Sequence, residues 1–130
     1  MRAPEPLHTL RVVADPAVLD ALSWPGGAAA LRLAPDDLLV IGLAGANAWA
    51  GLGGEPAIVE PDAGFVGWWL TPDELAEQVL EHLDWLLPTS RPALAQGLVA
   101  GVPAKLWLTD DRSLLLCAAA YAHELVERLA

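Results

Sequence analysis

Short apolar runs separated by turn residues make up most of the chain, and many of them alternate apolar and polar positions with the period of two expected of a half-buried strand. This pattern predicts strands over residues 7–13, 29–33, 38–43, 57–60, 65–70 and 94–102, and on both sides of a turn within 104–117. Three other stretches, 15–24, 71–87 and 119–130, carry the spacing and end signals of helices. Elements in this order predict an α+β fold whose helices pack on an antiparallel or mixed sheet.

The predicted helices have clear start signals. Asp15-Pro16 suits an N-cap followed by the first helical position, and residues 71–74, Thr-Pro-Asp-Glu, form a capping box. The second helix is expected to run to Leu87, because Pro88 ends it. Two apolar stripes are expected to cover the sheet: Leu75, Val79, Leu83 and Leu86 in the second helix, and Tyr121, Leu125 and Leu129 in the last.

One hairpin pattern occurs twice, as LRLAPDDLLVIG at 31–42 and as LWLTDDRSLLLC at 106–117. Leucines and an aspartate coincide in the two stretches, and each follows a predicted helix that ends near a Trp and a Pro. The ordinary alternative is that unrelated hairpins share alternating leucines and acidic turns. We predict a duplication, with ferredoxin-like β-α-β-β halves at about 7–56 and 57–130. Both halves are expected to belong to one domain, because two independent domains of this size would be only marginally stable.

Composition narrows the classes of partner. The chain has 130 residues, is 55% hydrophobic and carries a net charge of −10, so it can form a core but repels phosphate backbones and anionic lipid. We therefore expect no nucleic-acid or membrane partner. The uncharged stretch 38–54 is too short and too glycine-rich for a transmembrane helix. The one cysteine, Cys117, lies in an apolar run, which favours a buried thiol and a reducing cytoplasm.

The stretch 67–129 resembles the gamma subunit of heterotetrameric sarcosine oxidase, a family related to the glycine-cleavage T-protein. The features that carry the resemblance are the strand Phe65 to Leu70, the cap at Thr71, the pair Asp84-Trp85, the segment Gln96 to Ala100, the hairpin at Asp110-Asp111 and the pair Tyr121-Ala122. The resemblance implies an accessory subunit with no cofactor of its own. Flavin and tetrahydrofolate would belong to partner subunits of a complex that oxidises an N-methyl amino acid.

No catalytic constellation is found in the sequence. The three histidines, His8, His82 and His123, lie far apart without a metal-binding spacing, and no serine has the setting of a nucleophile elbow. The acidic pairs at 36–37 and 110–111 are interpreted as ordinary turn residues. We expect no metal site, and an enzyme acting alone is the least favoured reading.

A row of carboxylates runs along the helix predicted for 71–87. Asp73, Glu77, Glu81 and Asp84 follow one another at helical spacings, with no Lys or Arg between Thr71 and Ser90. Like charges at these spacings repel one another by about 0.2–0.5 kcal/mol per pair. One interpretation is that the row meets a basic partner surface; the other is that it is a solvated face that keeps the protein soluble.

Tryptophan is the second unusual feature, with six Trp against one Phe and one Tyr. In the predicted strand 65–70, Trp68 and Trp69 point to opposite faces, so both faces are apolar. The face away from the helices needs a cover: the other half of the domain, a second copy, or a larger subunit. Trp49, in the loop beside Asn47, is a further candidate for a ligand or partner contact.

The leading hypothesis is a non-catalytic, gamma-like subunit in which Trp68 or Trp69 and the carboxylates Glu77, Glu81 and Asp84 contact a larger subunit. A second hypothesis is a free-standing protein that binds a small, folate-like molecule in a pocket between the halves. The third is a homodimer of unassigned role.

Overall fold

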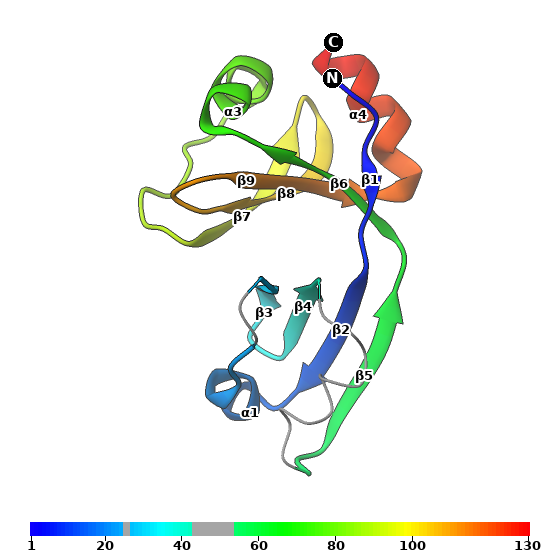
Figure 1. The fold of residues 1–130 in the computed structure, drawn as a ribbon, viewed down its shortest axis with the longest axis vertical. Helices are drawn as coiled ribbons and strands as arrows, with labels where there is room; N and C mark the ends of the chain where they lie inside the picture. Colours follow the sequence, from blue (N-terminus) through cyan, green and yellow to red (C-terminus); the bar gives the residue numbers. More distant parts are fainter. Residues whose placement is uncertain (25–26, 43–53) are drawn as a thin grey trace. The chain divides into compact units, whose positions relative to one another are not determined.

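The computed structural model describes residues 1–24, 27–42 and 54–130 and divides the chain into two compact units (Figure 1). The first unit, called here the C-terminal unit, joins Met1–Pro6 to Gly64–Ala130, and the second, the N-terminal unit, is Leu7–Ala63. Each unit has one antiparallel sheet and at least one helix of its own, so the predicted α+β class is confirmed.

The C-terminal unit is a five-stranded antiparallel sheet with helices on one face. Its strands, in the order β1-β6-β9-β8-β7, are β1 (Glu5–Pro6), β6 (Phe65–Leu70), β9 (Ser113–Ala118), β8 (Val102–Leu108) and β7 (Ala93–Val99). The helical elements are α3 (Pro72–Gln78), the 3₁₀ turns η1 (Leu80–His82) and η2 (Ala119–Tyr121), and α4 (Ala122–Leu129). Figure 1 shows α3 and α4 on the same side of this sheet.

Strand alternation decides which side chains the helices of this unit cover. Trp68 and Leu70 of β6 point to the helical side, where they pack with Val79 after α3 and with Leu125 and Leu129 of α4. Alternate residues of β7, β8 and β9 also point to the helical side and join this core: Ala95, Val99, Val102, Ala104, Leu106, Leu108, Leu115 and Cys117. This cluster is the hydrophobic core of the unit, and it confirms part of the predicted stripes.

The N-terminal unit has four antiparallel strands in the order β3-β4-β2-β5. They are β2 (Thr9–Ala14), β3 (Ala29–Ala34), β4 (Asp37–Ile41) and β5 (Ala57–Asp62), with α1 (Pro16–Ala21) between β2 and β3. The carboxylate of Asp15 accepts the Ala17 N–H at 3.1 Å, so the predicted cap is present. Leu19 of α1 packs on a core of Leu10, Val12, Ala14, Leu38 and Val40.

The two sheets have related strand orders. We match β6 with β2, β8 with β3 and β9 with β4. The order β8-β9-β6-β1 in the C-terminal unit then corresponds to β3-β4-β2-β5 in the N-terminal unit, and β7 is an additional strand. The matched hairpins β3-β4 and β8-β9 contain the repeated stretches. The predicted duplication agrees with this correspondence in strand order and stays a prediction. β5 pairs with β2, so residues 57–62 join the sheet of the N-terminal unit.

The helix predicted for 71–87 is wrong beyond Gln78. Thr71 and Glu74 form the expected capping box, but α3 ends at Gln78 and is followed by the single 3₁₀ turn η1 and then by extended backbone at Leu83. Tertiary contacts explain the early end. The His82 carbonyl accepts the Ala100 N–H at 3.1 Å, and the Trp85 indole N–H donates to the Leu98 carbonyl at 2.9 Å. Leu86, predicted on the buried stripe, is 95% exposed, and Tyr121 is 43% exposed.

Candidate functional site

The two tryptophans of β6 have different environments. Trp68 is 1% exposed, lies in the core and donates its indole N–H to the Arg2 carbonyl at 2.7 Å, so it is not a surface contact. Trp69 lies on the opposite face of the sheet, where the Arg112 guanidinium stacks 3.9 Å from the ring centroid. Trp69 is therefore the member of the pair that lies outside the helix-covered core. The cover predicted for the rest of this face stays a prediction.

The predicted acidic row does not lie on one helix face. Asp73 and Glu77 belong to α3, Glu81 belongs to η1, and Asp84 follows in a non-helical segment. The single-face arrangement is therefore wrong beyond Glu77, for the reason that ends α3. All four side chains are exposed. The same stretch also exposes two leucines, Leu80 at 39% and Leu86 at 95%.

The other sequence candidates do not form a reactive centre in the described part of the chain. Asn47 and Trp49 lie outside the described residues. No group of three His, Cys, Asp or Glu side chains that could hold a metal ion occurs in the described ranges. Burial raises the pKa of the Cys117 thiol, which favours its neutral form, and Cys117 is 1% exposed. Among the described helices, none is both long enough and apolar enough to span a bilayer.

A hollow of about 520 Å³ lies on the C-terminal unit. Cross-strand pairing brings its lining residues together: Phe65 of β6 pairs with Ala118 of β9, Lys105 of β8 pairs with both Leu116 and Gln96, and Leu98 of β7 pairs with Pro103. Tyr121 of η2 adds an aromatic ring. The remaining described lining residues are Gly97, Ala104 and Cys117. All eleven belong to one unit.

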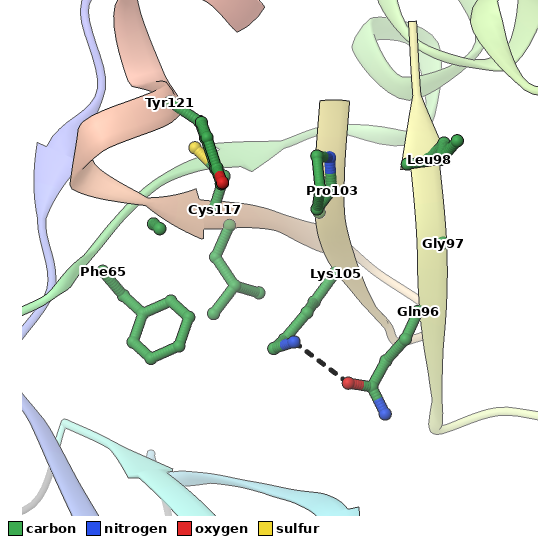
Figure 2. Close-up of a pocket in the computed structure, with 11 residues that line it drawn as sticks. Phe65, Gln96, Gly97, Leu98, Pro103, Lys105, Cys117 and Tyr121 are labelled. Carbon is green, nitrogen blue, oxygen red and sulfur yellow. Dashed lines mark hydrogen bonds between the residues drawn. The ribbon is translucent and has the colours of Figure 1, made fainter. Parts of the chain in front are cut away.

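Lys105 and Gln96 lie together at one end of the hollow, as Figure 2 shows. The Lys105 ammonium donates to the Gln96 side-chain oxygen at 3.0 Å and lies 6.0 Å from the centroid of the Phe65 ring. Pro103 and Tyr121 lie toward the other end. The hollow therefore combines an apolar lining with one cation, an arrangement typical of ligand sites, in which a few polar groups orient a mostly apolar molecule.

Sequence reasoning did not identify this hollow, although one signal was present. Lys105 is a charged residue in the middle of the apolar strand 102–108, on the face opposite the buried Leu106. A lysine at such a position has its ammonium at the edge of an apolar surface. The residues that surround it come from four strands and a 3₁₀ turn, and strand pairing alone decides which of them meet.

Comparison with known proteins gives a structural likeness. No family model matches the chain, and no curated protein matches it at the significance required. Among solved structures, the chain is similar to a chain of the heterotetrameric sarcosine oxidase from Corynebacterium sp. U-96, solved in complex with pyrrole 2-carboxylate. The TM-score is 0.76 and the identity 21%, over 98% of this chain and 80% of that chain. This likeness establishes a shared fold.

Proposed function

We propose that this chain is a non-catalytic, gamma-like accessory subunit of a sarcosine-oxidase-type complex, which oxidises an N-methyl amino acid. The observation that carries the proposal is the shared fold: a TM-score of 0.76 over 98% of this chain with a chain of a heterotetrameric sarcosine oxidase. The resemblance of residues 67–129 to the gamma subunit points to the same family. In this proposal the flavin and tetrahydrofolate are bound by partner subunits in the cytoplasm, and one-carbon metabolism is the process served.

The stretch 77–86 is the surface that we assign to the larger subunit. It exposes the carboxylates Glu77, Glu81 and Asp84 together with Leu80 and Leu86. Exposed apolar side chains among like charges fit an interface in which leucines are buried and the carboxylates face basic groups. Trp69, stacked on Arg112, is the aromatic candidate for a second contact.

The test is affinity purification of the tagged full-length protein from its own host, with co-purifying chains identified by mass spectrometry. The expected result is a larger flavin-containing chain recovered at equal stoichiometry, with sarcosine oxidase activity in the purified complex. Leu86→Ser combined with Glu81→Lys is expected to reduce the recovery of that chain at least about tenfold, because it removes an apolar contact and reverses a charge.

Ile58→Ser is the matched control. Ile58 is 59% exposed on β5 of the N-terminal unit, so its substitution removes an exposed apolar side chain outside the stretch 77–86. Full recovery of the partner with this variant is expected. Recovery of the tagged chain alone from the wild type would contradict the accessory role and favour self-association or a free-standing protein.

A further inference from the structure

We propose that the hollow on the C-terminal unit is a binding site for an organic anion with an apolar body, such as an aryl or alkyl carboxylate. The anionic group would lie at the Lys105 end and the hydrocarbon along the apolar lining. This site requires only the described residues of one unit, so it does not depend on the proposed role in a complex.

The size and lining of the hollow fit a small apolar body. Its volume, about 520 Å³, is within the range of small-molecule sites, roughly 300–1,000 Å³. Ala118 of β9 pairs with Phe65 of β6, and Leu116 of β9 pairs with Gly67. Pro103 of β8 pairs with Leu98 of β7. Leu98 is 55% exposed and Tyr121 43% exposed. A ligand here would bury apolar side chains that are now partly in contact with water, and that burial favours binding.

The charge at one end of the hollow selects an anion. None of the eleven described lining residues is acidic, and Lys105 is the one cation among them. In a chain with a net charge of −10, a site for an anion requires a local positive group. The Lys105 ammonium, which donates to the Gln96 side-chain oxygen at 3.0 Å, is that positive group.

The test compares 4-phenylbutyrate with its neutral amide, 4-phenylbutyramide, as probes of the full-length ¹⁵N-labelled protein. Amide chemical shifts are followed by two-dimensional NMR during titration at neutral pH. Saturable shifts with phenylbutyrate are expected at Phe65, Gln96, Lys105 and Ala118, with much weaker binding of the amide. Lys105→Met, which removes the charge and keeps most of the length of the side chain, is expected to weaken phenylbutyrate binding about fivefold, as a partly exposed charge pair would.

Arg91→Met is the matched control, because it removes one positive charge outside the hollow. The Arg91 guanidinium donates to the Pro88 and Ser90 carbonyls. The Arg91→Met variant is expected to bind phenylbutyrate with the affinity of the wild type. Ala118→Leu, which fills part of the hollow, is expected to abolish binding while the remaining spectrum stays folded. Four outcomes would each overturn the proposal. They are equal binding of the acid and the amide, wild-type affinity in Lys105→Met, shifts confined to Leu7–Ala63, and no saturable shifts.

Discussion

At the residue scale, the contact between Trp85 and Gly97 holds the segment after α3 against β7. A Cβ on Gly97 would lie 2.8 Å from Cε2 and 2.9 Å from Cζ2 of Trp85. Gly97→Ala must therefore displace the ring and strain the Trp85 bond to Leu98. The expected cost is about 1–3 kcal/mol in the free energy of unfolding, as for overpacking, measured by urea denaturation.

A double-mutant cycle separates this contact from the intrinsic effect of alanine in a strand. Trp85→Leu removes the ring that the Cβ would meet, so Gly97→Ala in that background is expected to be nearly neutral. Equal costs of Gly97→Ala with and without Trp85 would contradict the steric explanation.

The adjacent tryptophans of β6 give a second prediction at this scale. Trp68→Phe leaves a gap in the core and removes the 2.7 Å bond to the Arg2 carbonyl, so a loss of about 2 kcal/mol in unfolding free energy is expected. Trp69→Phe keeps a ring for Arg112 to stack on, and the expected loss is below about 1 kcal/mol. Urea denaturation of the two variants side by side measures the difference. A larger loss at Trp69 would contradict this assignment of core and outer face.

At the element scale, the start of α3 depends on charge. Glu74 accepts the Thr71 backbone N–H at 3.0 Å and pairs with Arg2 at 2.7 Å, and both contacts lower the pKa of Glu74 below its ordinary value of 4.5. The folded chain therefore keeps this carboxylate ionised to lower pH than the unfolded chain. Its contribution to stability is complete above pH 4.5 and is lost as the pH falls through the lower, folded pKa.

Glu74→Gln isolates that charge, because glutamine also completes a capping box. The wild type is expected to lose more stability than the variant between neutral pH and about pH 3.5, measured as urea midpoints at each pH. Thr71→Ala, which removes the N-cap oxygen, is the comparison: an expected loss of about 1 kcal/mol that is present at neutral pH as well. Parallel pH profiles for the wild type and Glu74→Gln would contradict the assignment.

Elements whose signals are local were predicted well from the sequence. The cap at Asp15, the capping box at Thr71 and the hairpin strands follow from adjacent residues. The length of α3 did not, because the bonds from Ala100 to His82 and from Trp85 to Leu98 join residues 13 or more positions apart and replace helical bonds. The tight turn at Ala100-Gly101, with φ of 50° and 80°, also breaks the predicted strand 94–102 into β7 and β8.

The candidate site was less predictable for the same reason. Trp68 and Trp69 were both proposed as contacts, and alternation placed them on opposite faces, but the sequence alone did not show which face holds the core. The hollow depends on the pairing of Lys105 with both Gln96 and Leu116, which is set by the strand order β9-β8-β7. The exposed Leu86 was unpredictable as long as the helix was expected to continue to Leu87.

At the scale of the whole molecule, the chain passes between the units twice, after Pro6 and after Ala63. The C-terminal unit is therefore not a continuous segment: β1 at Glu5–Pro6 forms its edge beside β6, and Arg2 contacts Glu74, the Trp69 carbonyl and Trp68. A short N-terminal segment thus completes a sheet whose other strands lie some 60 or more residues later in the chain. Stability of this unit is expected to depend on those first residues.

Deletion of Met1–Pro6 tests this dependence. It exposes the edge of β6, leaves the buried Trp68 indole N–H without a partner and removes the cation from Glu74, so a loss of at least about 2 kcal/mol is expected for the C-terminal unit. Native-state hydrogen exchange is the measurement, because it reports each sheet separately. Protection is expected to fall in β6 and β9 and to stay unchanged in β2 and β4. Arg2→Ala keeps the backbone carbonyl that Trp68 uses and should have a smaller effect, whereas an equal fall in both sheets would mean that Met1–Pro6 stabilises the whole chain rather than one unit.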